Sequence, residues 1–289
     1  MESNDDLKYT VAICNYNMAH TLGKSLKSIL EQLDERFEVL VVDDGSNDGS
    51  QEILNELESE YEIFRWVEGE NDNLAEARNQ SFEEAKGKYI LESLDTDDVY
   101  KPVIKDFVMI FEKLNEVIDK DFYLNAYNLN VAPRRLLLDK VPYRSLGYGE
   151  DKDLRRRLLA KDVVVILEIN QPYKSIGYDY DRLDYLEIAY DITRVQFRSG
   201  ISWSSFVKGK LKNIEYTNDI FEILISPIAY IDARFKGVYG LPDGWERWNK
   251  YYEEKEKNTN TLTDLEERYN LEIAKELSQQ GKNVFLTKN

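Results

Sequence analysis

Three aspartates stand close together after a short apolar run, and their side chains are the first candidates for chemistry. Asp95, Asp97 and Asp98 follow the segment YILESL, so like charges crowd where the chain turns. Two carboxylates within ~4–6 Å raise each other's pKa values or else hold a cation between them. Carboxylate oxygens suit Mg²⁺ or Mn²⁺, which would in turn hold a diphosphate. The alternative is that these acids cap a helix near Pro102, although a cap needs only one of them.

A second polar cluster follows an earlier apolar run, in the segment DDGSNDGS at residues 43–50. This composition is typical of a turn, so a purely structural role for Asp43 and Asp44 stays open. In a nucleotide site, Asp44 would accept a hydrogen bond from a base N–H, and Tyr16 would stack on the base. Arg78 is a candidate for a pyrophosphate contact, with an exposed surface arginine as the alternative.

The pair Glu150-Asp151 precedes a predicted helix. A carboxylate beside a metal site can take the proton from a hydroxyl that attacks an anomeric carbon, so this pair is the candidate general base. Arg157, nearly two turns further along, would hold this acid in place, and Gly147 and Gly149 would let the segment approach a ligand closely. The structural alternative is that acids in a first turn stabilise the helix through its dipole.

Short β-rich runs alternate with helical patterns over the first hundred residues, and this order positions the acidic clusters. The predicted strands cover residues 9–14, 37–42, 63–67 and 89–94. Apolar residues at helical spacing lie between them, with Thr21 as the predicted cap of the first helix. Strict alternation predicts an α/β fold with a mixed, mostly parallel sheet flanked by helices. Ligands of such sheets bind beyond the carboxyl ends of the strands, where residues 15–17, 43–46 and 95–98 all fall.

After residue 115 the alternation of strand and helix patterns becomes less regular. From about residue 244 the pattern is that of solvent-exposed helices. Apolar residues recur at every fourth position of one predicted terminal helix, at Leu265, Tyr269, Ile273 and Leu277. We therefore expect one α/β domain over residues 1–215 and a mainly helical C-terminal extension at 216–289.

Composition excludes several classes of protein. The formal net charge of −17 argues against nucleic-acid binding, which needs a basic footprint. Cys14 is the single cysteine and His20 the single histidine, so the chain has neither an internal disulfide nor a metal site with several histidines. The single cysteine predicts a cytoplasmic location.

The most apolar later stretch is IFEILISPIAYI at residues 220–231, which is too short to span a bilayer. A buried core element is the first interpretation of this stretch. The alternative is an element that lies on the membrane surface as a peripheral contact, close to Lys208, Lys210 and Lys212.

Five motifs follow one another between residues 8 and 162. They are VAICNYNMAHTLGKSLKSILEQ, VVDDGSNDGS, ARNQSFEEAKGKYI, LDTDD and GEDKDLRRRL. In this order they resemble the inverting family-two glycosyltransferases of the GT-A fold. The resemblance implies an enzyme that moves a sugar from a nucleotide-diphosphate donor to an acceptor hydroxyl. It also implies that residues 1–100 are the nucleotide-binding half and residues 101–215 the acceptor half. A UDP-sugar is favoured over a GDP-sugar as donor, and the acceptor is a sugar or a lipid-linked molecule.

The resemblance also implies roles for the polar residues at the strand ends. It places the donor base near Asn15, Tyr16 and Asp44. Asp97 is similar to the ribose or metal contact of the family, and Asp98 to its main metal ligand.

Further along the chain, Asp151 is similar to the catalytic base, with Glu150 beside it, whereas Asp95 is expected to give structural support. One departure concerns the base contacts, because Cys14-Asn15 stands where the family usually has a proline followed by threonine or serine. The Gln-x-x-Arg-Trp signature of processive synthases is absent, which favours transfer of a single sugar.

Three other classes of function fit these motifs less well. A GT-A-like nucleotidyltransferase would open with a Gly-rich, basic phosphate loop after the first strand, which NYNMAH is not. A non-catalytic nucleotide-sugar-binding module is disfavoured because both the metal acids and the Glu-Asp pair are present. A dinucleotide-dependent oxidoreductase is disfavoured because G-x-G-x-x-G does not follow the first strand.

Overall fold

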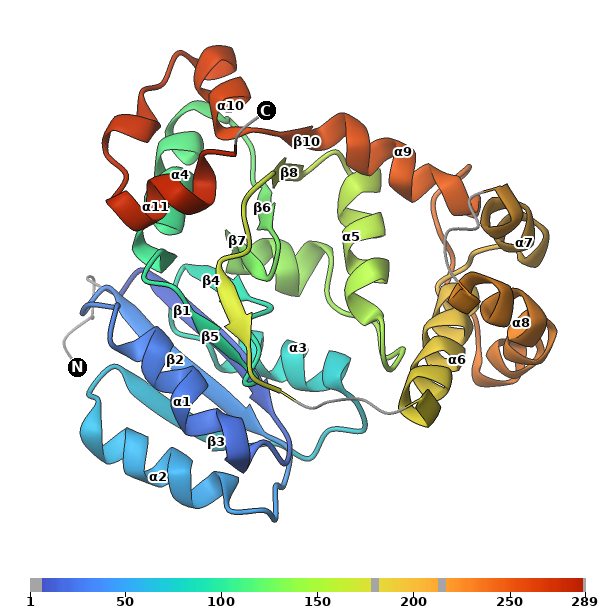
Figure 1. Ribbon diagram of the computed structural model, residues 1–289, viewed down its shortest axis with the longest axis horizontal. Coiled ribbons are helices and arrows are strands. Elements are labelled where there is room, and N and C mark those ends of the chain that lie inside the picture. The colour runs from blue at the N-terminus through green and yellow to red at the C-terminus, as the bar shows by residue number, and fades with distance from the viewer. Residues whose placement is uncertain (1–6, 178–181, 213–216, 288–289) are drawn as a thin grey trace.

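Eight strands form the central sheet of the computed structural model, which describes residues 7–177, 182–212 and 217–287 (Figure 1). Their order across the sheet is β10-β8-β6-β7-β4-β1-β2-β3. The bounds are β1 Tyr9–Asn15, β2 Phe37–Asp43, β3 Phe64–Glu68, β4 Tyr89–Glu92, β6 Tyr123–Ala126, β7 Leu129–Pro133, β8 Val164–Leu167 and β10 Thr259–Asn260. Strand β7 runs antiparallel to its neighbours β4 and β6, whereas the other pairs are parallel. The predicted mixed, mostly parallel sheet is confirmed.

The register of the central strands brings their polar ends to one edge. β1 and β2 pair from Tyr9 opposite Phe37 to Asn15 opposite Asp43. Both strands are apolar runs and almost entirely buried, as is usual for parallel strands covered on both faces. β4 runs parallel to β1 on its other side, so the acidic turn after β4 reaches the same edge.

Helices cover both faces of the sheet (Figure 1). One face carries α1 Ala19–Leu30, α2 Ser50–Glu60 and α4 Ile104–Val117, and the other carries α3 Leu74–Glu84, α5 Glu150–Ala160 and α9 Trp248–Asn258. The faces form two hydrophobic clusters because side chains alternate along a strand. Val11 and Ile13 of β1 pack in the first cluster, and Ala12 packs in the second.

A separate helical layer follows, made of α6 Arg182–Arg198, α7 Trp203–Lys212 and α8 Thr217–Lys236. Its own small core contains Phe197, Phe206 and Ala233 together with Trp248 of α9. Among the helices that the structure describes, none is both long and apolar enough to cross a membrane.

The C-terminal residues are mainly helical, as predicted, and part of them packs on the α/β domain. The short strand β10 pairs with β8 at the sheet edge, and α10 Leu262–Tyr269 and α11 Gln279–Phe285 pack against α4 in the main core. Their polar outer faces give the solvated pattern seen in the sequence. Part of residues 262–285 thus lies in the same core as α1 and α4.

Three local predictions were wrong. The terminal stripe is not one helix: Leu265 and Tyr269 lie in α10, Ile273 in the single turn η2 Ile273–Lys275, and Leu277 in the bend before α11. The break occurs because Asn270 takes a left-handed conformation with φ 54° that ends α10. Thr21 does not cap α1, which begins at Ala19, and is buried in its first turn. The apolar run at 122–131, whose residues taken alone predict a single strand, is a hairpin, since Tyr127 with φ 56° reverses the chain between β6 and β7.

Candidate active site

The acidic turn brings its three carboxylates together. Oxygen atoms of Asp95, Asp97 and Asp98 all lie within 4.8 Å of one another. Asp98 begins the short strand β5 Asp98–Tyr100, which pairs with β9 Tyr173–Ser175. The backbone of Asp95 is fixed from two sides, because its N–H donates to the Tyr100 hydroxyl at 2.7 Å and its carbonyl accepts from Ser25 at 3.0 Å. The turn is therefore built to hold three acids in one place.

The electrostatics of this cluster fit a bound cation. Burial raises the pKa of Asp95 to about 7, with Arg78 acting to lower it and Asp97 to raise it. Burial and the neighbouring Asp97 raise the pKa of Asp98 to about 6, while hydrogen bonds from Ser175 and Asn128 lower it. Carboxylates that are costly to ionise together gain from a positive charge among them. An all-oxygen set of this kind suits a hard divalent ion.

The ends of β1 and β2 form the second part of the site. Asn15 is 3% exposed, and its amide donates to Asp43 at 2.7 Å, which ties the two strand ends together. Asp43 also accepts from Ser46 and is fully buried, so it holds the turn. Tyr16, in contrast, is 62% exposed and offers its ring to a ligand. Burial raises the pKa of the Cys14 thiol, the residue before Asn15 on β1, to about 12, so this thiol stays neutral.

Asp44 is held at the rim of this edge by the loop after β3. Its Oδ1 accepts from the Asn71 side chain at 2.7 Å. Gly69 lies so close that a Cβ there would be 2.2 Å from the same oxygen. The loop after β3 thus fixes the direction of Asp44, which sequence reasoning considered in isolation.

The start of α5 presents the Glu-Asp pair. Gly149 precedes the helix with φ 98°, a left-handed conformation that a residue with a Cβ adopts only with strain. Glu150 is buried, whereas the half-buried Asp151 faces a cavity. One Asp151 oxygen accepts from the Lys152 N–H at 2.7 Å, and the other forms an ion pair with Arg155.

The prediction that Arg157 holds Asp151 was wrong. Arg157 is buried, and its Nε donates to Asp153 at 2.7 Å. Asp151 pairs instead with Arg155, one turn along the same face. The signal was present in the sequence, because acidic and basic residues four apart on a helix face each other.

Arg78 is mostly buried, so the alternative interpretation as an exposed surface arginine is wrong. Its guanidinium lies 3.0 Å from Glu92 of β4 and 3.2 Å from Glu150 of α5. The Tyr143 ring lies under it, 5.4 Å away. Arg78 therefore links the strand that carries the acidic turn to the helix that carries the candidate base.

Glu92 is the buried anchor of this link, and sequence reasoning missed it. The side chain is 1% exposed and accepts from the hydroxyls of Tyr123 and Tyr143 and from Asn130. A carboxylate buried in this way needs several donors. The signal was a glutamate inside the apolar run YILESL.

A cavity of about 310 Å³ lies between these parts. Of the predicted site residues it brings together Asp95, Asp151, Glu150 and Arg78, whereas Asn15, Tyr16, Asp44, Asp97 and Asp98 do not line it. Asp95 is thus both a member of the acidic cluster and a wall of the cavity, although only structural support was expected of it.

The β6–β7 hairpin and α6 supply walls that the sequence did not indicate. Tyr127 and Asn128 at the hairpin tip line the cavity, as does Ile192 of α6. Asn128 also donates to Asp95 at 3.1 Å. An adjoining cavity of about 370 Å³ shares Tyr127, Asn128 and Arg155 with the first. The site therefore continues past the Asp151–Arg155 pair.

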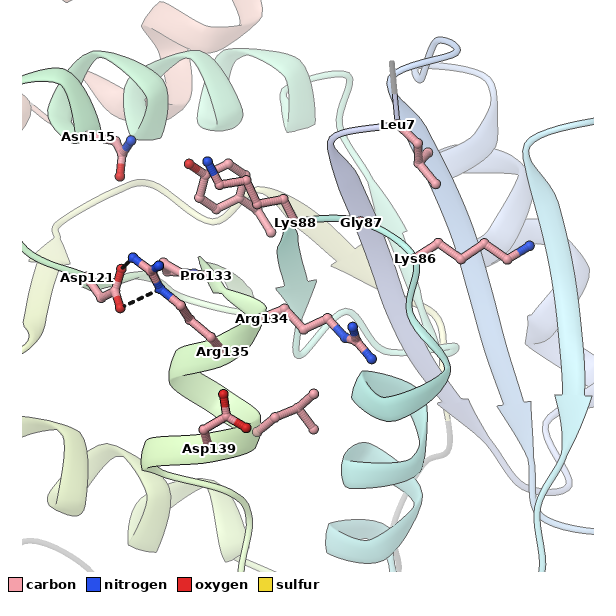
Figure 2. A pocket seen from close by; sticks show the side chains of 12 residues that line it. Leu7, Lys86, Gly87, Lys88, Asn115, Asp121, Pro133, Arg134, Arg135 and Asp139 are labelled. Atoms are coloured by element: carbon pink, nitrogen blue, oxygen red, sulfur yellow. Dashed lines mark hydrogen bonds and ion pairs between the residues drawn. The ribbon is translucent and has the colours of Figure 1, made fainter. Parts of the chain in front are cut away.

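A larger cavity of about 650 Å³ lies at the opposite edge of the sheet, among the residues before β4 and after β7 (Figure 2). Figure 2 shows that Arg135, which lines this cavity, is paired with Asp121. The Arg134 guanidinium donates hydrogen bonds to the backbone carbonyls of Phe82 and Glu83. In sheets of this type ligands bind at the carboxyl ends of the strands, so the smaller cavity is the better candidate.

Comparisons with known proteins found a family model and several relatives. The family model described as Glycosyl transferase family 2 matches residues 10–162, which is more than half of the chain. A cholesterol galactosyltransferase of Borreliella burgdorferi is 29% identical over 132 residues, which are 45% of this chain and 37% of that protein. The Escherichia coli UDP-Glc:alpha-D-GlcNAc-diphosphoundecaprenol beta-1,3-glucosyltransferase WfgD is 26% identical over 154 residues, which are 50% of this chain and 58% of that protein. Both alignments cover less than two thirds of the relative.

The fold is also found among solved structures. The mannosyltransferase PcManGT of Pyrobaculum calidifontis, solved with GDP-Man and Mn²⁺, aligns with a TM-score of 0.51 over 79% of this chain and 73% of that chain. Its sequence identity of 16% means that the likeness shows the fold alone.

Proposed function

The chain belongs to glycosyl transferase family 2, and we propose that it transfers a sugar from a nucleotide-diphosphate donor to an acceptor hydroxyl, with inversion at the anomeric carbon. The observation that carries this proposal is the shared cavity, in which Asp95 of the acidic turn and Asp151 of α5 form two of the walls. A donor held at the acidic turn would have its reacting carbon near a carboxylate that can take a proton.

The base and ribose of the donor are assigned to the edge formed by β1 and β2. Tyr16 is exposed for stacking, and Asp44 is fixed by Asn71 as an acceptor for a base N–H. A UDP-sugar is favoured over a GDP-sugar, in line with the UDP-Glc in the name of one relative.

A divalent cation, Mg²⁺ or Mn²⁺, is assigned to the acidic turn. Asp98 is the main ligand and Asp97 is shared with the ribose, and Asp95 lies close enough to contribute an oxygen. When bound, the cation offsets the negative charge that develops on the leaving nucleoside diphosphate. The Mn²⁺ present in the solved mannosyltransferase supports this assignment.

Asp151 is assigned as the base. It takes the proton from the acceptor hydroxyl while the hydroxyl oxygen forms a bond to the anomeric carbon. The bond from that carbon to the diphosphate oxygen breaks on the opposite side, and the electron pair leaves with the nucleoside diphosphate. The pairing with Arg155 holds the carboxylate in one direction during this step.

The acceptor is assigned to the lipid-linked class on the cytoplasmic side of a membrane. One relative is named for a diphosphoundecaprenol acceptor and another for cholesterol. The adjoining cavity near Glu168 and Lys255, which continues from the hairpin tip, gives such an acceptor room beyond the base.

Two substitutions separate the assigned roles. Asp98→Asn should abolish the Mn²⁺-dependent binding of UDP. Asp151→Asn should retain that binding and lower sugar transfer by ~10²–10⁴-fold. Calorimetry with UDP and Mn²⁺ measures the binding, and nucleoside-diphosphate release with an acceptor panel measures the turnover. Asp119→Asn, at an exposed position distant in sequence from both clusters, is the matched control.

Full turnover in the Asp151 variant would remove the assignment of the base. UDP binding that is equally tight without Mn²⁺ would remove the assignment of the cation. UDP binding without any transfer or donor hydrolysis, in the unmodified protein and across all acceptors, would favour the non-catalytic binding module instead.

A further inference from the structure

Helix α8 exposes an apolar stripe that nothing in the described structure covers. Its exposed side chains at residues 220–231 are all apolar, namely Ile220, Leu224, Pro227, Ile228 and Ile231. Phe235 continues the stripe at 86% exposed, and Leu224 is 71% exposed. Large apolar side chains repeated at helical spacing on one outer face usually mark a binding surface. The apolar stretch is therefore only partly the core element that its sequence first suggested.

Helix α7 brings a partly exposed tryptophan against α8. Trp203 is 42% exposed, and its indole N–H donates to Ser226 of α8 at 3.0 Å, so the two helices meet there. Tryptophan is enriched where an apolar body meets a wet polar boundary.

The exposed charges on α7 and on the described part of α8 are all positive, although the whole chain carries −17 and the exposed Glu246 and Glu253 lie near Lys208 and Lys212. The exposed charged side chains of α7 and of the described part of α8 are Lys208, Lys212, Arg234 and Lys236. The acids of α8 are turned to other partners. Asp219 and Glu222 pair with Lys210, and Asp232 lies near Arg194 of α6 and Lys236.

We propose that α8, with Trp203 of α7, docks on the surface of an anionic phospholipid membrane, with its apolar stripe at the boundary between headgroups and acyl chains. An amphipathic helix with cations at its margin binds such a surface through apolar burial and through attraction to anionic lipid. A second copy of the chain is a poorer partner. A symmetric dimer presents the same patch to itself, and here the exposed charges would repel.

The position of α8 determines how far the proposed membrane surface lies from the cavity of the candidate active site. α8 lies at the outer edge of the molecule and packs on α6 (Figure 1), where Arg194 of α6 approaches Asp232 of α8 at 3.4 Å. Ile192 of α6 lines the candidate active site. One helix therefore separates the bilayer from the cavity. The docking surface itself goes beyond the proposed sugar transfer, and vesicle binding tests it without any donor or acceptor.

The test is cosedimentation of the full chain with vesicles of phosphatidylglycerol mixed with phosphatidylcholine, and with vesicles of phosphatidylcholine alone. We expect tighter binding to the anionic vesicles. Leu224→Gln combined with Phe235→Gln should weaken binding by roughly 100-fold or more, because two apolar side chains lose their burial. Both positions are well exposed, so the fold should be retained, as circular dichroism checks. Val117→Gln, at a 40% exposed apolar position of α4, should leave binding unchanged.

The electrostatic part has its own variant. Arg234→Gln combined with Lys236→Gln should weaken binding to anionic vesicles by roughly 30-fold, while Lys24→Gln with Lys275→Gln should not. Absence of vesicle binding in the unmodified protein would overturn the proposal. Equal binding by the Leu224 and Phe235 variant would do the same. A concentration-dependent dimer that this variant abolishes, seen by sedimentation without vesicle binding, would assign the stripe to a second copy instead.

Discussion

The two halves of the candidate site are joined by a buried ion network of three side chains. Arg78 lies between Glu92 and Glu150, and all three are shielded from water. A buried charge that loses its partner is strongly destabilising, because its desolvation is no longer offset. We therefore propose that Arg78 mainly holds Glu150 in position and, through Glu150, the neighbouring Asp151.

Arg78→Met tests this assignment. It should lower the free energy of unfolding by about 3–5 kcal/mol, because two carboxylates stay buried without their cation. Urea denaturation measures the change. Arg36→Met is the control, since Arg36 pairs with Asp34 at the surface and should cost less than about 1 kcal/mol. An unchanged urea midpoint in the Arg78 variant would mean that this side chain serves only the ligand.

At the residue scale, the acidic positions could be predicted and their partners only in part. Asp95, Asp97 and Asp98 follow an apolar strand, and the end of such a strand in a parallel sheet fixes where they lie. The spacing of four residues also predicts the Asp151–Arg155 pair, although Arg157 was expected to hold Asp151. The contact between Arg78 and Glu150 joins residues 72 positions apart along the chain, and local sequence does not encode such a pairing.

The start of α5 is the element whose geometry matters most for the proposed base. Gly149 holds a left-handed φ of 98° immediately before Glu150, and this turn sets the direction in which the helix begins. A side chain at this position is strained because Cβ meets the neighbouring carbonyl oxygen.

Gly149→Ala should therefore lower the free energy of unfolding by about 1–2 kcal/mol and reduce sugar transfer. Gly23→Ala supplies the contrast. Gly23 lies within α1, and its Cβ would make an ordinary contact with Ile53 at 3.5 Å. That change should stabilise the protein by about 0.5–1 kcal/mol. If both variants shifted the thermal midpoint in the same direction, the strained turn would not be the cause.

Elements were predictable where each strand or helix carries its own periodic pattern. The strands β1, β2, β3 and β4 and the helices between them match the apolar runs of the first hundred residues. The β6–β7 hairpin was not recognised, because its turn relies on Tyr127 in a conformation that glycine or asparagine usually adopts. The hairpin tip is part of the candidate site, so this omission also hid Asn128.

At the scale of the whole molecule, the C-terminal helices α10 and α11 pack against the main core, and sequence patterns did not reveal this packing. α10 and α11 bury Leu265, Val284 and Phe285 in the main core against α4. These helices are short, and most of their surface is polar, so their pattern resembles that of a solvated tail. Their place depends on contacts with residues about 170 positions earlier, such as the hydrogen bond from Ser278 to Asp106.

A pair of phenylalanines distinguishes a C-terminal region that belongs to the core from one that is only attached. Phe285 is fully buried, and its ring stacks on that of Phe107 with centroids 6.3 Å apart. Phe285→Ala should lower the free energy of unfolding by about 3–5 kcal/mol, because a large buried ring leaves a cavity. Phe235→Ala, at the exposed end of α8, should change it by less than about 0.5 kcal/mol. Calorimetric unfolding should also show a single transition that the Phe285 variant shifts as a whole. A separate transition for the C-terminal residues, with the main one unmoved, would instead mean that these residues fold apart from the core.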